Sequence, residues 1–275
     1  MQITVIGAAG GYPYGGHACS SFLVESRGQS LLLDAGPGVA LRVLGRGPAI
    51  QLDGIAISHC HPDHVLDLIP LGYALMTEWI STRSLRRVPL ALPEGGTAFL
   101  QSLSALFGHK HWRFTEDDCG PGFDRLRDTA AAGQDWLFEV FEIHEFTASD
   151  SFDIAGLSLA TCAVDHMPGA VALRLSDGDK TLVYTGDTRW TDALPPFAAD
   201  CDLLIADAHF SGSEPPGGAH MSPAEAARLA KAARARALML THLAAPSDAE
   251  AALASARAAC DVPVCLALTT DAVTL

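Results

Sequence analysis

The chain has 275 residues, 49% of them hydrophobic, and its 18 basic and 32 acidic side chains give a formal net charge of −14. We expect one domain over residues 1–275, and the negative charge argues against a stable nucleic-acid partner because it repels polyanions, with a local basic patch as the alternative. Seven cysteines without a CxxC pair, and no apolar run long enough to cross a membrane, predict a cytoplasmic protein with no membrane anchor.

The first part of the chain alternates apolar runs with turn residues, which predicts strands separated by short connections. The expected strands cover residues 2–7, 20–26, 29–36, 52–58 and 87–93. The expected helices cover residues 37–47, 62–79 and 95–108. The first of these helices has proline near its start and glycine near its end, the usual asymmetry of a short helix.

Residues 108–135 lose this periodicity, which predicts a lid, a loop or a subunit contact inserted in the domain. Six of the eleven phenylalanines lie between Phe107 and Phe146. They favour an apolar substrate pocket or a dimer contact, with core packing of an expected strand at 136–143 as the simpler alternative.

The second part of the chain predicts a further group of strands, followed by helices. The expected strands cover residues 136–143, 156–164, 170–177, 180–187, 201–210, 237–243 and 271–275, and the expected helices cover 222–235 and 247–259. Each half thus has strands and then helices, without a strict βαβ alternation. Two sheets sandwiched between helices would accommodate this order.

The stretch ISHCHPDH places three histidines and an aspartate within six residues, where a strand leads into a helix. Alternate side chains of an extended chain point the same way, so His59 and His61 converge. Pro62 suits the first helical position, and Asp63 and His64 project from the opening turn. Isolated surface histidines and an aspartate at a helix N-terminus are the alternative, but this dense pattern favours a site for zinc, manganese or iron.

This stretch resembles the HxHxDH signature of the metallo-β-lactamase superfamily, which implies an α+β fold, the four-layer αββα sandwich. AVDHMPG, VYTGDT and LMLTHL match later landmarks of the family in the same order. The resemblance implies that His59, His61, His166 and Asp187 hold one metal ion, and that Asp63, His64, Asp187 and His242 hold a second.

The resemblance further implies metal-assisted hydrolysis by two divalent ions, with zinc expected and manganese or iron as alternatives. A water that bridges two cations loses its proton near neutral pH and becomes a nucleophile, while both cations stabilise charge on the attacked group. We expect Asp63 and Asp187 to take part in catalysis as well as in metal binding. No GxSxG motif offers a serine nucleophile instead.

YTGDTRW and GGAHMSPAEAA resemble the ribonuclease Z and small phosphodiesterase branch, which implies phosphodiester cleavage and a homodimer. Only twenty residues separate His166 from Asp187, too few for the arm that grips tRNA, and Ala206 and Asp207 replace the first two residues of the branch's His-Glu-Ala-Thr loop. We therefore expect a small-molecule phosphodiester, including cyclic nucleotides. A lactone, thioester or other carbonyl ester is the alternative substrate, and a non-catalytic metal-binding protein is a further alternative.

Two more residues match positions of this branch. His220 matches a histidine that could deliver a proton to an alkoxide leaving group, although it could also simply precede the N-cap Ser222. Asp34 matches an aspartate that supports the site by orienting a ligand imidazole, with a role in the following glycine turn as the alternative.

Four residues are weaker candidates for substrate contact or support. Asp207 and His209 end an apolar strand near the expected site. Tyr12 and Tyr14 lie in the glycine-rich loop after the first strand, which tends to overhang the metals in this fold. Surface aromatics on a flexible turn are the alternative for the two tyrosines.

Overall fold

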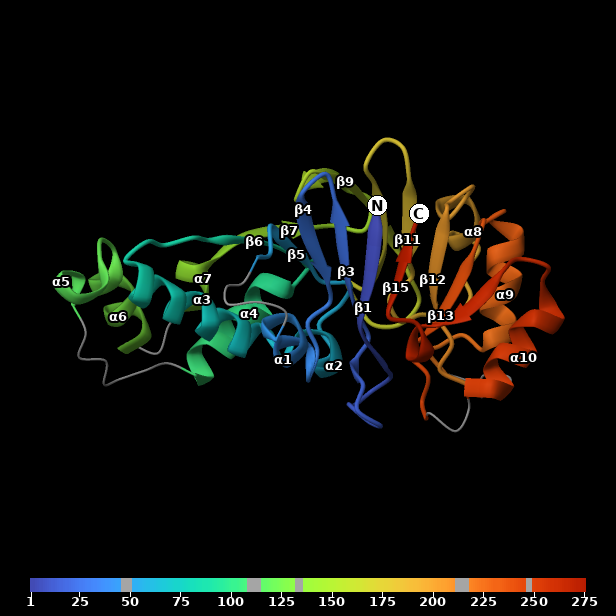
Figure 1. Cartoon of the computed structure of the whole chain (residues 1–275), viewed down its shortest axis with the longest axis horizontal. Coiled ribbons are helices and arrows are strands. Elements are labelled where there is room, and N and C mark those ends of the chain that lie inside the picture. Colours follow the sequence, from blue (N-terminus) through green and yellow to red (C-terminus); the bar gives the residue numbers. More distant parts are fainter. Residues whose placement is uncertain (46–50, 108–114, 132–135, 211–217, 246–248) are drawn as a thin grey trace.

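The computed structural model describes residues 1–45, 51–107, 115–131, 136–210, 218–245 and 249–275. Two β-sheets pack face to face, and helices cover the outer side of each (Figure 1). This four-layer arrangement confirms the predicted α+β class and its αββα sandwich.

The first sheet changes from antiparallel to parallel pairing along its width. Its strands are β1 (Gln2–Ala9), β2 (Ala18–Cys19), β3 (Ser21–Ser26), β4 (Gln29–Leu33), β5 (Gly54–Ala56), β6 (Val88–Pro93), β7 (Phe141–Phe146) and β15 (Ala272–Thr274). Their order is β15-β1-β3-β4-β5-β6-β7, with β2 beside β1. The pairs β1–β3 and β3–β4 are antiparallel, whereas β4 to β7 run parallel.

The second sheet repeats this change. Its strands are β8 (Ser151–Ile154), β9 (Leu157–Ala163), β10 (Val171–Ser176), β11 (Thr181–Tyr184), β12 (Leu203–Asp207), β13 (Leu238–Thr241) and β14 (Val264–Leu266). They are ordered β14 to β8, antiparallel from β8 to β11 and parallel from β11 to β14. Parallel strands end at a common edge, so residues that follow them gather there.

Helices on the two outer faces complete the sandwich (Figure 1). They are α1 (Val39–Leu44), α2 (Pro62–Val65), α3 (Leu68–Thr82), α4 (Gly96–Leu106), α5 (Glu116–Cys119), α6 (Phe123–Ala131), α7 (Trp136–Val140), α8 (Leu194–Phe197), α9 (Pro223–Ala232) and α10 (Ala249–Ala259). The 3₁₀ helix η2 (Ala267–Thr269) instead contacts β1 of the first sheet and β13 of the second. None of the helices formed by the described residues combines the length and apolar character needed to span a bilayer.

Three hydrophobic clusters fill the three interfaces between the four layers. Strand β4 shows how the sequence produces them, because Leu31 and Leu33 face the other sheet while Leu32 faces the helices. All three side chains are fully buried, and each contributes roughly 1.5–3 kcal/mol to folding. The continuous apolar run of this strand therefore reflects burial on both faces.

The helix predicted from residue 62 to residue 79 is interrupted between α2 and α3. The backbone N–H of Asp67 donates to the carbonyl oxygen of Ala35 at 2.8 Å, and its carboxylate accepts from the N–H of Ala40 at 2.8 Å. These bonds tie the chain to the segment after β4. They divert it from a continuous helix, and residue spacing alone does not reveal such contacts.

The strand predicted over residues 136–143 is wrong in its first five residues, which form α7. Trp136, Leu137 and Val140 of this helix are fully buried in the layer that covers the first sheet. Their spacing fits one face of a helix, so tertiary packing overrides the strand preference of the run. The prediction also missed β2, β8, β14 and α8, which have two to four residues each.

The described part of the predicted insertion at 108–135 forms α5 and α6. α5 contacts α3, α6 contacts α7, and both α5 and α6 lie at the end of the molecule away from α2 (Figure 1). This part therefore does not cover the histidines, and residues 108–114 and 132–135 lie outside the described residues. Phe123, Trp136 and Phe146 are at most 1% exposed, which supports the core-packing alternative over a substrate pocket.

Candidate metal centre

The seven predicted metal ligands meet at one edge of the sandwich. His59 and His61 lie between β5 and α2, Asp63 and His64 lie in α2, and His166, Asp187 and His242 follow β9, β11 and β13. The first group of adjoining ligating atoms comprises His59, His61 and His166, and the second comprises Asp63, His64, Asp187 and His242. Within each group these atoms all lie within 4.8 Å of one another.

The Asp187 carboxylate lies between the two groups. Its Oδ2 is 3.6 Å from His59 Nε2 and 3.8 Å from His166 Nε2, both in the first group. The same oxygen is 3.3 Å from His64 Nε2 and 3.2 Å from His242 Nε2, both in the second group. One carboxylate thus has the position of a ligand shared by two ions.

Unpaired polar atoms show that this donor set fits cations. Among the described residues, His59 Nε2, His64 Nε2 and Asp187 Oδ1 are buried without a hydrogen-bond partner. A buried polar atom without a partner costs roughly 1–3 kcal/mol. Coordination of a divalent ion by these nitrogen and oxygen atoms would remove that penalty, as expected for imidazole and carboxylate ligands.

The Asp34 carboxylate accepts several hydrogen bonds that orient the histidines of this stretch. It accepts the backbone N–H of Ser58 at 2.7 Å, and the hydroxyls of Ser58 and Tyr184, each at 2.8 Å. It also lies 2.7 Å from His64 Nδ1. Because the Ser58 hydroxyl donates to Asp34, it is an acceptor for His59 Nδ1 at 3.1 Å. Both imidazoles are thereby protonated on Nδ1, and Nε2 is left for a cation.

A backbone carbonyl orients the His166 ring, as side-chain oxygens orient His59 and His64. Its Nδ1 lies 3.0 Å from the carbonyl oxygen of Ala219, which can only accept. Its Nε2 lies 2.9 Å from Nδ1 of His61. Since a carbonyl acceptor requires the proton on Nδ1, His166 also presents an unprotonated Nε2 to the centre.

Backbone strain and close packing both occur at this edge. Asp34 and His242 each follow a strand directly, and both have a φ of 59°, a left-handed conformation that costs about 1–3 kcal/mol for such residues. Gly36 permits a close approach, because a Cβ there would lie 1.6 Å from the carbonyl oxygen of Asp63. The loop after β4 can therefore support the ligand turn only with glycine at this position.

The electrostatics of the cluster set its protonation. Burial raises the pKa of Asp187, but His242 and His64 outweigh it and hold this pKa well below its ordinary value. Burial lowers the pKa of His59 well below its usual range, whereas Asp187 and Asp34 outweigh burial and raise the pKa of His64. The carboxylate is thus ionised and His59 neutral, as metal binding requires, and a cation at His64 would displace a proton.

A carboxylate–imidazole pair adjoins the second group. Asp207 Oδ2 lies 2.8 Å from His220 Nδ1 and accepts the N–H of Thr188 at 3.0 Å, while Asp207 Oδ1 accepts the N–H of His209 at 3.0 Å. The His209 and His220 rings stack with centroids 4.4 Å apart. Asp207 is fully buried and the His220 side chain is 17% exposed, so the imidazole is the member that a substrate could reach.

The loop after β1 also reaches the centre. The N–H of Gly11 donates to Asp63 Oδ2 at 3.0 Å, and the Tyr14 hydroxyl donates to the carbonyl oxygen of Leu243 at 2.5 Å. The Tyr14 hydroxyl therefore anchors the loop beside the strand end that carries His242. Tyr12 is 62% exposed and packs edge-to-face against Tyr14, so of the two rings it is the more open to solvent.

Ser58 and Tyr184 are functional residues that the sequence analysis missed. Ser58 directly precedes His59, and this adjacency was the available signal for its role. No comparable signal marks Tyr184, because its partner Asp34 lies 150 positions earlier in the chain.

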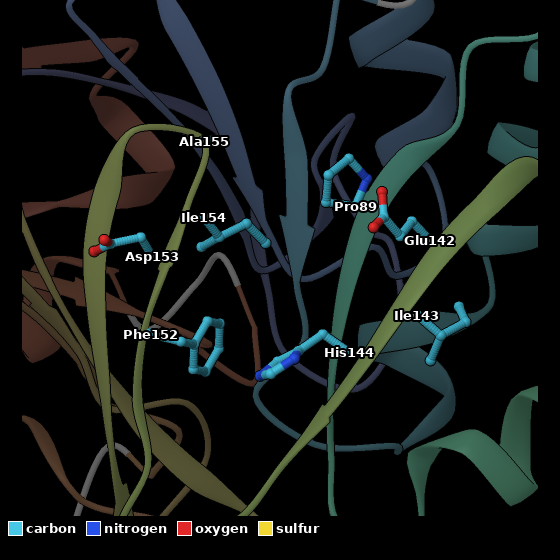
Figure 2. Close-up of a pocket in the computed structure, with 8 residues that line it drawn as sticks. All are labelled: Pro89, Glu142, Ile143, His144, Phe152, Asp153, Ile154 and Ala155. Atoms are coloured by element: carbon cyan, nitrogen blue, oxygen red, sulfur yellow. The ribbon is translucent and has the colours of Figure 1, made fainter.

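A separate cavity lies between the edge strands β7 and β8, as Figure 2 shows. It has a volume of about 350 Å³ and is lined by Pro89, Glu142, Ile143, His144, Phe152, Asp153, Ile154 and Ala155. The His144 ring packs against Phe152 with centroids 4.3 Å apart. His144 thus belongs to this cavity and to neither group of metal ligands.

Comparisons with known proteins agree with this geometry. The model of the metallo-beta-lactamase superfamily matches residues 14–243. Probable metallo-hydrolase YhfI of Bacillus subtilis (strain 168) is 31% identical over 244 residues, covering 88% of this chain and 87% of that protein. Ribonuclease Z of Mycobacterium bovis (strain BCG / Pasteur 1173P2) is 28% identical over 210 residues, covering 74% and 69% respectively.

Solved structures share the fold. The crystal structure of YhfI from Bacillus subtilis superposes with a TM-score of 0.78 at 25% identity, covering 96% of this chain and 95% of the other. A diphosphatase of the PhnP family superposes with a TM-score of 0.64 at 19% identity, covering 88% and 85%, a likeness of fold alone. The predicted resemblance is thus confirmed, and the chain belongs to the metallo-β-lactamase superfamily.

Proposed function

We propose that this protein is a dinuclear metal-dependent hydrolase that cleaves small phosphodiesters. The observation that carries the proposal is the position of Asp187 between two groups of ligating side chains. His59, His61 and His166 would hold one ion, and Asp63, His64 and His242 the other, with Asp187 shared. When bound, the two cations, for which the donor set suits zinc, supply Lewis acidity and lower the pKa of water.

Asp63 is the carboxylate better placed to take a proton from the attacking water. Its side chain is 12% exposed, against 3% for Asp187. Gly11 N–H fixes one of its oxygen atoms. Asp63 therefore combines a fixed orientation with access from the substrate side.

His220 supports the choice of a phosphodiester over a carbonyl ester. An alkoxide leaving group needs a proton, and an imidazole held by a buried carboxylate is suited to deliver one. Asp207 Oδ2 lies 2.8 Å from His220 Nδ1 and so orients the imidazole for this transfer. The names of two compared proteins, a ribonuclease and a diphosphatase, agree with phosphate chemistry. The charge of −14 favours a small substrate over a long polyanion.

The first test combines metal content with hydrolysis. We expect zinc-loaded protein to contain two ions per chain and to hydrolyse bis(p-nitrophenyl) phosphate, with Asp63→Ala inactive. p-Nitrophenyl acetate and a lactone would be assayed beside it. Turnover of only the carbonyl substrates would overturn the phosphodiester assignment, and loaded protein without turnover of any of them would indicate a non-catalytic metal-binding protein.

The second test compares substrates whose leaving groups differ in their need for a proton from His220. His220→Asn should lower hydrolysis of a cyclic nucleotide by about 10²–10⁴-fold. The effect on the p-nitrophenyl diester should be much smaller, because p-nitrophenolate leaves without protonation. His144→Asn, in the separate cavity (Figure 2), is the matched control and should leave both rates unchanged. An equal loss on both substrates would argue against His220 as the acid.

A further inference from the structure

Four histidines direct Nε2 toward Asp187, and the partner of each outer nitrogen decides which tautomer they adopt. An imidazole that binds a cation through Nε2 carries its proton on Nδ1 and needs an acceptor there. Three of the four have oxygen acceptors, namely Ser58 Oγ for His59, Asp34 Oδ2 for His64 and the Ala219 carbonyl oxygen for His166.

The fourth histidine, His242, has a different partner. Within the part of the chain that the structure describes, Nδ1 of His242 lies within hydrogen-bond distance of Nδ1 of His209, at 3.3 Å. Asp207 Oδ1 lies at 3.8 Å, beyond a hydrogen bond. The His242 side chain is 3% exposed, so bulk water offers little compensation for a missing acceptor.

We propose that Nδ1 of His209 accepts the Nδ1 proton of His242 and so holds this imidazole in the tautomer that binds the second cation. His209 is then a positioning residue, neutral and protonated on Nε2. It occupies the place that an oxygen acceptor has behind the other three imidazoles. The inference rests on the dinuclear site of the proposed function and assigns a role to a residue outside the ligand set.

The surroundings of His209 fix its ring for this purpose. Its backbone N–H donates to Asp207 Oδ1, and its ring stacks on His220 at an interplanar angle of 22°. A Cβ on Gly10 would lie 3.0 Å from His209 Nδ1, so the absence of a side chain there leaves room for the imidazole. His209, the proposed acceptor, is thus held between the His220 ring and Gly10.

A competing bond gives the inference a distinctive signature. His209 Nδ1 also lies 3.2 Å from the carbonyl oxygen of His242, to which it could only donate. One ring nitrogen cannot donate and accept at the same time. With its proton on Nδ1, His209 would donate to the carbonyl oxygen. If His242 held a cation through Nε2, its own proton would be on Nδ1, and His209 would have to accept there. The proton of His209 would then be on Nε2, with no change in its charge.

Metal affinity tests the positioning role. Zinc titrations against a chelator would compare the whole chain with His209→Leu, which removes the acceptor, and His209→Asn, whose amide oxygen can replace it. We expect His209→Leu to weaken the second ion by about 10–100-fold while the first binds as before, and His209→Asn to recover most of the loss. Equal affinities in all three proteins, or equal losses in both variants, would overturn the inference.

The two proposals fail in different ways in this experiment. A parent protein that binds one ion per chain would contradict the dinuclear site itself. Two ions bound equally well by parent and His209→Leu would leave that site intact and contradict only the role of His209.

Imidazole ¹⁵N NMR tests the tautomer directly and needs no substrate. In the zinc-loaded protein we expect the His209 ring to be neutral and protonated on Nε2, with His242 protonated on Nδ1. His209→Asn serves to assign the signal. A His209 ring that remains protonated on Nδ1 with two zinc ions bound would overturn the inference.

Discussion

The two halves of the molecule build the centre in different ways. The first half supplies four predicted ligands from the single stretch 59–64, which runs from the end of the β5–α2 connection into α2. The second half supplies one ligand after each of three strands, namely His166, Asp187 and His242. Local chain geometry therefore places the first set, whereas the alignment of a whole sheet places the second.

The two halves therefore depend on different contacts to position their side chains. The turn depends on what lies behind it, chiefly the Asp34 carboxylate and the close approach at Gly36. The ligands of the second sheet depend on strand register, since the parallel pairing of β11, β12 and β13 brings their ends to a common edge. Substitutions in each half, and at contacts between the halves, test whether each set of side chains depends on the contacts named above.

The largest effect is expected where both halves meet, at Asp187. Asp187→Ala removes a carboxylate that lies beside both groups, so we expect loss of at least one ion per chain and a fall in hydrolysis on the order of 10⁴-fold. His61→Ala, which removes a ligand of the first group alone, is the comparison. Metal analysis and kcat/KM measure both, and two ions retained by Asp187→Ala would contradict the shared position.

Gly36→Ala should damage the first half alone. The added Cβ would meet the Asp63 carbonyl oxygen at 1.6 Å, so we expect a loss of about 1–3 kcal/mol in unfolding free energy and weaker binding of the second ion. Gly16→Ala is the control, because Gly16 has a φ of 81° but nothing near its Cβ position. Denaturant unfolding and zinc titration should show the metal defect in Gly36→Ala only; the same metal defect in both variants would exclude close packing as its cause.

Tyr184→Phe tests the link between the halves. The Tyr184 hydroxyl, on the second sheet, donates to Asp34, which supports His64 on the first. We expect a loss of about 1–2 kcal/mol in unfolding free energy, since this bond is buried. The second zinc ion should also bind about tenfold more weakly. Unfolding and titration measure the two effects, and a stability loss with unchanged zinc affinity would show that Asp34 holds His64 without this bond.

The smallest effect is expected at a contact between the sheets outside the centre, and it depends on pH. Burial raises the pKa of Asp177. Hydrogen bonds from Ser26 and from the N–H groups of Lys180 and Asp179 outweigh burial and lower this pKa to about 2. A lowered pKa contributes stability above the ordinary carboxyl value that is lost as pH falls toward 2. The gap in unfolding free energy between the parent and Asp177→Asn should therefore close between about pH 4 and pH 2. A gap that is constant with pH would contradict this.

The sequence was sufficient for the features that depend on neighbouring residues. The HxHxDH stretch places four predicted ligands within six residues, and the apolar runs that end before His166, Asp187 and His242 predicted the strands that these residues follow. The family resemblance assigned those three residues to the site, and their positions after strands agree with it, because the ends of strands that run in the same direction meet at one edge. The order of elements was compatible with two sheets between helices, and the αββα class that the family resemblance implied is confirmed.

Only the tertiary structure decided which atoms face one another. Nothing local indicates that Tyr184 bonds Asp34 across the sandwich, that His209 stands behind His242, or that Trp136 begins a helix. These outcomes depend on contacts between segments distant in the chain, and hydrogen-bond geometry there is decided within tenths of an ångström. Residue spacing carries no information on that scale, so the sequence could predict which side chains gather at this edge but not the bonds that orient each of them.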